Sequence, residues 1–360
     1  MKRIALIIGM SAIMFAVVVS CKKDNNETTV QNSLAKDIVE AEAGTDGKYI
    51  YILNEGVWGG NDASLDRIEV ASGEYQSDVF AKQNGRGLGD VANDIQIYGS
   101  KMYIVVNNSN IVEVLDPETA RSVRQIQLAG KQPRYIVGHE GYVYVSCYSD
   151  EVLKIDTATF SVVGSCAVGH DPEMLAVAGS NLYVVNSGGL DNPNYDTTLS
   201  VVDLSTFAET RKVAVGINPT KLAKIDDNRL LMVCNGNYGS IPSSMAVFRL
   251  SDDTVIRIPH KCTNFVINCG FAYCYDYDYA NSTPIFFSVN LGDYRAEGSH
   301  ISVSQKIEIP YGIALNPGNG NVYLTDSHGF VSNGDIHCYR NGHLAYMHEC
   351  GSGPSKVAVW

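Results

Sequence analysis

The sequence has few charges and lacks the motifs of several large protein classes. Charged residues make up 18% of the 360 residues, the formal net charge is −12, and no run of five basic residues occurs. An acidic chain without a basic stripe does not suit nucleic acid or an anionic lipid surface. GxSxG, HExxH, Walker and dinucleotide-binding glycine motifs are also missing. We therefore expect no enzymatic activity and no catalytic cofactor.

Metal-binding spacing is absent as well. The chain has nine cysteines but no CxxC and no Cys/His cluster at zinc spacing. Several cysteines lie inside apolar strand patterns, as Cys274 does in "YCYDY". We expect such residues to be buried thiols and expect no bound metal. The sequence does not decide whether one or two disulfides form.

The first 47 residues read as targeting and tether segments. Lys2 and Arg3 precede an uncharged run that ends in "VVSC" at Cys21. This pattern resembles a bacterial lipoprotein signal, which implies a signal peptide over residues 1–20 and a lipid on Cys21. Residues 21–47 are polar and aromatic-free, which predicts a flexible tether. Their charged start resembles the export signal of Bacteroidota surface lipoproteins, and implies a cell-surface protein anchored in the outer membrane.

The rest of the chain is a repeat rich in glycine and tyrosine. The stretch "PRYIVGHEGYVYVSCYSDEVLKIDTATFSVVGSCAVG" at Pro133 returns in variant form further along the chain. Copies start at residues 92, 133, 172, 219, 263 and 310, so they are 41, 39, 47, 44 and 47 residues apart. Each copy contains four short period-2 or apolar stretches bounded by turn residues, here called strands A to D. Four strands per repeat of this length indicate the blades of a β-propeller.

The two ends of the chain complete the count. "GPSKVAVW" at the C-terminus is an A strand with nothing after it, and residues 48–80 supply B, C and D strands with no A before them. Together they make one composite blade, whose last strand closes the ring without a free edge. We therefore predict an all-β, seven-bladed propeller over residues 48–360.

The repeats resemble a known propeller family. The B strands read "YILN", "YIVV", "YVSC", "YVVN", "YCYD" and "YLTD". These resemble YVTN-type propellers. With the lipoprotein signal and the opening "LNEGVWGGNDASL", the chain is most similar to the BtuG group of Bacteroidota surface lipoproteins. That resemblance implies capture of a corrinoid (vitamin B12 or a related cobamide) as bound ligand, and transfer to a TonB-dependent, BtuB-like outer-membrane transporter.

Propeller geometry predicts where a ligand would bind. The D–A and B–C loops share one face, and five B–C loops are long: residues 54–64, 186–198, 235–244, 276–284 and 325–334. Insertions on one rim are typical of a binding face. The D–A loops add a polar inner ring at the channel mouth. The predicted ligand-binding residues are Asn54, Trp58, Asn93, Arg134, Tyr135, Tyr148, Asn186, Tyr195, Asn235, Tyr238, Asp276, Tyr277, Tyr311, His328 and Phe330.

Two alternatives use the same face. A surface glycan-binding, adhesion or protein-interaction propeller would carry the same aromatic rim and the same lipid anchor. A propeller hydrolase or lactonase often holds calcium centrally, and Glu173, Asn264, Asn93 and Asp94 supply oxygen donors for such a site. For the recurring Asn54, Asn186, Asp276 and Asp326 at B-strand ends, capping of the following turn is the competing role.

Overall fold

The computed structural model describes residues 46–278, 281–330 and 332–360, all within one compact unit. The predicted signal peptide, Cys21 and nearly all of the tether lie outside the described residues. Within the described part, no helix has the length and apolar character needed to cross a membrane.

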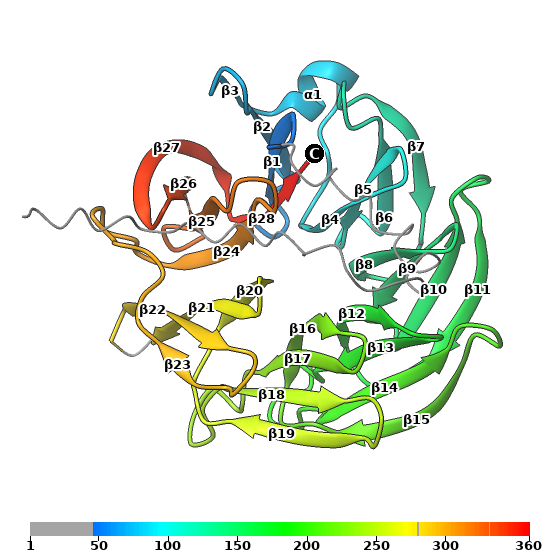
Figure 1. Ribbon diagram of the computed structural model, residues 1–360. Helices are drawn as coiled ribbons and strands as arrows, with labels where there is room; N and C mark the ends of the chain where they lie inside the picture. The colour runs from blue at the N-terminus through cyan, green and yellow to red at the C-terminus, as the bar shows by residue number, and fades with distance from the viewer. Residues whose placement is uncertain (1–45, 279–280, 331) are drawn as a thin grey trace, which may run out of the picture. The chain divides into compact units, whose positions relative to one another are not determined.

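Seven four-stranded antiparallel sheets make up this unit and follow one another around a ring (Figure 1). Blade 1 contains β28 (Pro354–Val359), β1 (Tyr49–Asn54), β2 (Ser64–Glu69) and β3 (Tyr75–Gln76). Blade 2 contains β4 (Ala92–Tyr98), β5 (Lys101–Val106), β6 (Ile111–Leu115) and β7 (Ser122–Gln127). Blade 3 contains β8 (Pro133–His139), β9 (Tyr142–Cys147), β10 (Glu151–Asp156) and β11 (Val162–Ala167).

The remaining blades repeat the same order from the axis outward. Blade 4 contains β12 (Pro172–Ala178), β13 (Asn181–Asn186), β14 (Thr198–Asp203) and β15 (Ala208–Ala214). Blade 5 contains β16 (Pro219–Asp226), β17 (Arg229–Cys234), β18 (Ser244–Arg249) and β19 (Thr254–Ile258). Blade 6 contains β20 (Asn264–Asn268), β21 (Phe271–Asp278), β22 (Thr283–Asn290) and β23 (Ala296–Glu297). Blade 7 contains β24 (Pro310–Leu315), β25 (Val322–Asp326), β26 (Asn333–Arg340) and β27 (His343–Ser352). The predicted seven-bladed propeller is confirmed.

The C-terminal strand closes the ring, as predicted. β28 pairs antiparallel with β1, with Tyr51 opposite Ala358. The Trp360 backbone N–H donates to the Tyr49 carbonyl at 2.9 Å, and the two rings stack with centroids 5.6 Å apart. The first and last strands of the propeller are thus joined in one sheet, which removes both free edges.

Burial falls from the middle of each blade to its outer edge. Neighbouring blades cover both faces of the B and C strands, so β5 and β6 are buried at nearly every position. The outermost strand has solvent on one side, and β7 is mostly exposed. The recurring B-strand tyrosines, Tyr51 and Tyr323 among them, are buried in the clusters between blades. These repeated residues are therefore structural.

Two segments differ from the sequence prediction. The stretch at Val79–Phe80, expected to continue the last strand of blade 1, forms the short helix α1 (Val79–Asn84). The Asp78 carboxylate accepts from the Ala81 N–H at 3.1 Å and caps the first turn, which stops the strand at Gln76. In blade 6, the predicted loop over residues 276–284 is largely strand, because Asp276 pairs with Ile285 and Asp278 with Thr283.

Apart from Cys269, which is disulfide-bonded, the described cysteines fit the expectation of buried thiols. Seven of them, at positions 147, 166, 234, 262, 274, 338 and 350, are free and buried. Burial raises the pKa of the Cys234 thiol to about 12, so it stays protonated at neutral pH.

Candidate ligand-binding site at the channel mouth

The D–A and B–C loops meet on one face, as predicted. In six blades, the residue at the start of the B–C loop donates its backbone N–H to the carbonyl of a D–A residue. The donor–acceptor pairs are Glu55–Gly353, Asn107–Val91, Tyr148–Gln132, Ser187–Asp171, Asn235–Asn218 and Ser327–Ile309. This repeated bond fixes both loop sets around a single channel mouth.

Several of these D–A residues have a left-handed backbone. Val91, Gln132, Asp171 and Asn218 have φ values of 60°, 49°, 45° and 55°, each directly before an A strand. Val91 is β-branched, and such a residue at positive φ costs on the order of 1–3 kcal/mol. Because Val91 also lines the mouth, this strain lies at the candidate site.

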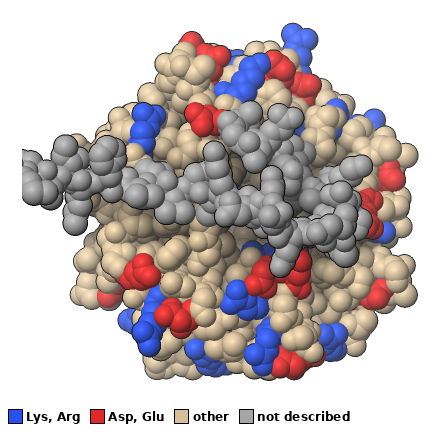
Figure 2. Space-filling model, viewed as in Figure 1, with Lys and Arg blue, Asp and Glu red and all other residues tan. Residues whose placement is uncertain are grey.

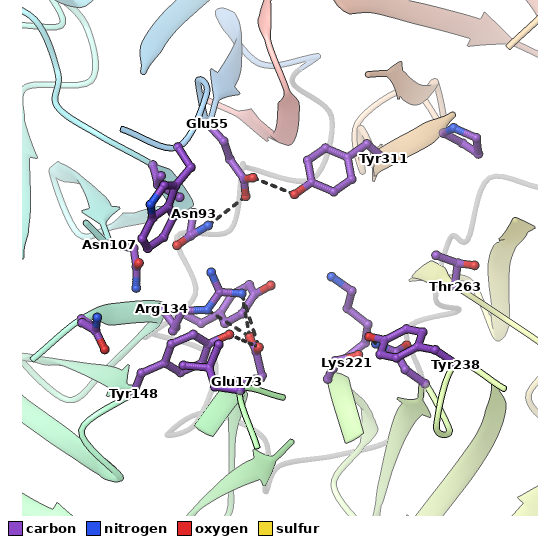
Figure 3. A pocket seen from close by; sticks show the side chains of 18 of the residues that line it. Glu55, Asn93, Asn107, Arg134, Tyr148, Glu173, Lys221, Tyr238, Thr263 and Tyr311 are labelled. Carbon is purple, nitrogen blue, oxygen red and sulfur yellow. Dashed lines mark hydrogen bonds and ion pairs between the residues drawn. The ribbon is translucent and has the colours of Figure 1, made fainter. Parts of the chain in front are cut away.

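A cavity of about 450 Å³ opens at this mouth and receives side chains from all seven blades. Eight of the predicted residues line it: Trp58, Asn93, Arg134, Tyr135, Tyr148, Asn235, Tyr238 and Tyr311. Glu55, Asn107, Glu173, Leu190, Thr220, Lys221 and Thr263 are among the other lining residues. Figure 3 shows the labelled side chains converging from opposite sides of the opening.

An ion pair forms one wall of this cavity. The Arg134 guanidinium contacts the Glu173 carboxylate, with Nη2 3.1 Å from Oε2. The Tyr148 hydroxyl donates to Glu173 Oε1 at 2.5 Å, and the guanidinium lies 4.7 Å from the Tyr148 ring centroid. Burial by itself would lower the pKa of Arg134, but Glu173 and the nearby tyrosines raise it well above its usual value. Arg134 is thus a fixed cation held by a carboxylate and an aromatic face.

A second carboxylate lies on the opposite wall. Glu55 accepts from Asn93 Nδ2 at 2.9 Å and from the Tyr311 hydroxyl at 2.7 Å (Figure 3). Burial, and then the negative charge of Glu55, raise the pKa of Tyr311 well above its usual value. Tyr311 therefore remains a donor at neutral pH. Phe330 packs edge-on against the Tyr311 ring at 4.8 Å and holds it in place.

Lys221 is a further cationic side chain of this cavity, and it forms no ion pair with any described carboxylate. It is half-buried in the cavity wall and makes no hydrogen bond or ion pair with any residue that the structure describes. Burial, followed by repulsion from Lys356, lowers its pKa to about 8. Lys356, by contrast, contacts Asp94 at 3.2 Å, and both lysines lie over the Tyr135 ring. Lys221 is therefore the side chain with most capacity left for a ligand.

Exposed apolar side chains surround the polar mouth. Trp58, Leu190 and Tyr238 come from the B–C loops of three different blades and are 67%, 67% and 69% exposed. Tyr195 contacts the Tyr238 ring edge-on at 6.0 Å, and Asn235 Nδ2 donates to the Tyr238 hydroxyl at 3.1 Å. Tyr195 thus supports the rim without lining the cavity.

A second groove continues outward between blades 5 and 6. It has a volume of about 560 Å³ and shares Asn235, Tyr238 and Thr263 with the mouth cavity. The predicted residues Asp276 and Tyr277 line this groove instead of the channel mouth. The two spaces are joined at Tyr238.

Besides Tyr195 and Phe330, which pack against lining residues, three predicted residues line neither space. Asn54 and Asn186 are fully buried and use their amides inside their own blades: Asn54 donates to Asp66 at 2.7 Å, and Asn186 donates to Ser200 at 2.9 Å. The structure therefore does not bring these two amides to the mouth, because both donate to side chains on the adjacent C strand of their own blade. His328 contacts Asp335 at 2.8 Å in blade 7, outside the cavity lining.

The predicted residue list omitted Glu55, Glu173 and Lys221. Glu173 and Lys221 belong to the inner ring of D–A residues, so propeller geometry alone places them at the mouth. Their importance follows from their pairing, which the sequence does not show. Glu55 directly follows a B strand, and its role depends on contacts to Asn93 and to Tyr311, 256 residues away.

Both carboxylates considered for calcium are held in ion pairs. Glu173 pairs with Arg134 and Asp94 with Lys356, while Asn93 donates to Glu55. Within the described ranges, no group of three or more His, Cys, Asp or Glu side chains is arranged to hold a metal ion. On the face in Figure 2, acidic and basic side chains are interspersed on a mostly uncharged surface.

The fold and this mouth define a seven-bladed β-propeller with a polar pocket on its axis. Residues 47–341 match the family described as Domain of unknown function (DUF5074), and the chain belongs to this family. No curated protein sequence matches the chain.

Solved propellers share the fold at low identity. A quinonprotein alcohol dehydrogenase-like protein from Bacteroides thetaiotaomicron aligns with a TM-score of 0.65 and 14% identity, over 87% of this chain and 78% of that one. A putative 6-phosphogluconolactonase from Bacteroides fragilis aligns with a TM-score of 0.63 and 12% identity, over 88% of this chain and 99% of that one. Kuenenia stuttgartiensis hydrazine synthase aligns with a TM-score of 0.59 and 16% identity, over 72% of this chain and 86% of that one. Their printed functions differ, and the likeness concerns the fold alone.

Proposed function

We propose that this protein is a lipid-anchored surface binding protein that captures a corrinoid at the channel mouth and passes it to a TonB-dependent outer-membrane transporter. One observation carries the binding role. Trp58, Leu190 and Tyr238 project exposed apolar area from three separate loops around one polar pocket. Exposed apolar groups gathered around a concave polar site are typical of ligand recognition.

The chemistry of the mouth suits a large flat ligand with polar edges. A cavity of about 450 Å³ holds only part of a corrinoid, so the ring would rest on the apolar rim. Asn93, Asn107 and Asn235 offer amide groups near the ring edge, and Arg134 and Lys221 offer cationic donors. A corrin ring with peripheral amides and a phosphate-bearing tail would use both features.

Anchoring and transfer rest on the sequence. The lipoprotein-like segment before Cys21 and the polar stretch up to residue 47 support attachment to the outer membrane and reach away from it. The resemblance to the BtuG group supports transfer to a transporter. In this proposal the protein binds its ligand and performs no reaction.

Titration of the full-length chain, purified in detergent, with cyanocobalamin tests the binding role. We expect heat of binding at one-to-one stoichiometry and a protein that stays pink after desalting. A colourless protein with no heat would contradict corrinoid capture. If a glycan then released heat on the same chain, the rim would be a carbohydrate site.

A further inference from the structure

Two opposite charges face each other across the mouth without touching. Glu55 projects from the B–C side of blade 1, and Lys221 projects from β16 in blade 5 toward the same opening (Figure 3). Glu55 has two hydrogen-bond donors but no cation within contact distance among the described residues. Two other pairs of opposite charges at the channel do form ion pairs among the described residues: Arg134 with Glu173, and Lys356 with Asp94.

Two residues that line the same cavity as these charges carry polar atoms without a partner. Asn93 is 3% exposed. Its Nδ2 donates to Glu55, while its Oδ1 has no partner within the described structure. Thr220 Oγ1 is also buried without a partner and lines the same cavity. A buried polar atom without a partner destabilises the folded protein, and a bound polar group would offset this effect.

The donors and acceptors of the site indicate which chemical group of a ligand would bind there. Lys221 only donates, whereas Glu55 and Asn93 Oδ1 only accept. An anion would be attracted by Lys221 but repelled by Glu55, whereas a cation would be attracted by Glu55 but repelled by Lys221. A neutral group with an acceptor atom beside an N–H₂ donor would satisfy both walls together.

We infer that the mouth is a carboxamide-binding subsite, in which Lys221 donates to the carbonyl oxygen while Glu55 and Asn93 Oδ1 accept from the amide N–H₂. This inference rests on the proposed function insofar as it assigns the peripheral amides of a corrinoid to this pair. It also defines the site for any other ligand that presents a primary amide.

The charges around Lys221 make the interaction sensitive to pH. Arg134 and Lys356 repel its ammonium group, whereas Glu55 and Glu173 attract it, and the Tyr135 ring lies 5.9 Å away. Its pKa of about 8 means that the charged ammonium donor becomes a weaker, neutral amine donor as the pH rises through that value. Affinity for an amide should therefore fall about tenfold between about pH 7 and about pH 9.

Small probes test the subsite without a corrinoid. Propionamide, propionate and propylammonium have similar size and differ in charge. Ligand-observed NMR on the full-length chain should show propionamide binding at least about fivefold more tightly than either ion. Tighter binding of propionate or of propylammonium, or no binding of any probe, would overturn the assignment.

Variants separate this subsite from general effects. K221M and E55Q should each weaken propionamide binding about tenfold, and K221M should abolish its pH dependence. K224M, on the same strand with an exposed lysine paired to Asp227, should bind as the wild type does. Wild-type affinity in K221M and E55Q would refute the inference. Cyanocobalamin binding is read separately, so its failure alone rejects the proposed function and leaves the amide result standing.

Discussion

Arg134 and Glu173 come from β8 and β12, the innermost strands of neighbouring blades, and their side chains meet at 3.1 Å on the wall of the channel mouth. Both are largely shielded from solvent, with side chains 17% and 7% exposed. A buried ion pair stabilises little compared with apolar packing, but removing one partner leaves an uncompensated charge. The pair therefore links the shape of the site to the stability of the ring.

Breaking this pair should destabilise the fold. E173Q leaves the Arg134 guanidinium without a counterion and leaves one neutral amide oxygen to accept from both Arg134 and Tyr148, so we expect a loss of about 2–4 kcal/mol in the free energy of unfolding. Denaturant unfolding measures it. D252N breaks an exposed, solvent-screened pair with Arg249 and should cost clearly less than E173Q. Equal losses in the two variants would contradict the special role of the channel pair.

The rim aromatics should affect binding without affecting stability. W58A and Y238A remove exposed rings, so we expect cyanocobalamin affinity to fall by about 1–4 kcal/mol in each variant while unfolding is unchanged. Calorimetry measures the affinity. V163A removes an exposed apolar residue from the outer strand of blade 3 and should bind normally. Unchanged affinity in both rim variants would remove these rings from the site.

Lys221 should weaken the fold at neutral pH. Its pKa is lowered from 10.5 to about 8 in the folded state, so between these values the unfolded chain binds more protons and stability rises with pH. Below about pH 8 the full penalty is present. We expect K221M to gain about 1–3 kcal/mol at pH 7 and to lose this advantage as the pH approaches 10.5.

Unfolding curves of K221M and wild type across that range give the comparison, with K224M as the matched control. A gain that does not change with pH would show that the advantage comes from apolar packing of methionine and not from removal of a buried charge.

Closure of the ring should depend on Trp360. Its indole stacks on Tyr49, and its backbone joins β28 to β1, so W360A should cost about 1–3 kcal/mol. Thermal unfolding measures the loss. The chain has two tryptophans, and W58A serves as the control because Trp58 is exposed and contributes no core packing. A larger loss in W58A than in W360A would argue against closure through this strand.

About half of the predicted binding residues line the channel mouth, and two of the others show what the sequence left open. Trp58, Arg134 and Tyr238 were predicted from loop position, which the repeat defines. Asn54 and Asn186 have an equivalent position in the repeat, but their amides turn inward to bond within the blade. The direction of a short polar side chain depends on neighbours in adjacent strands, which one sequence does not specify.

The amino-acid sequence alone determined the propeller, the number of blades and the closing strand, because a repeat with period-2 strands can bury its two faces only by stacking against copies of itself. It also determined which loops share a face. The tertiary structure decided the chemistry of the mouth: which carboxylate neutralises Arg134, that Tyr311 reaches Glu55, and that no described residue forms an ion pair with Lys221. These contacts join residues that are tens to hundreds of positions apart, and their charges interact strongly only because burial on the axis excludes water.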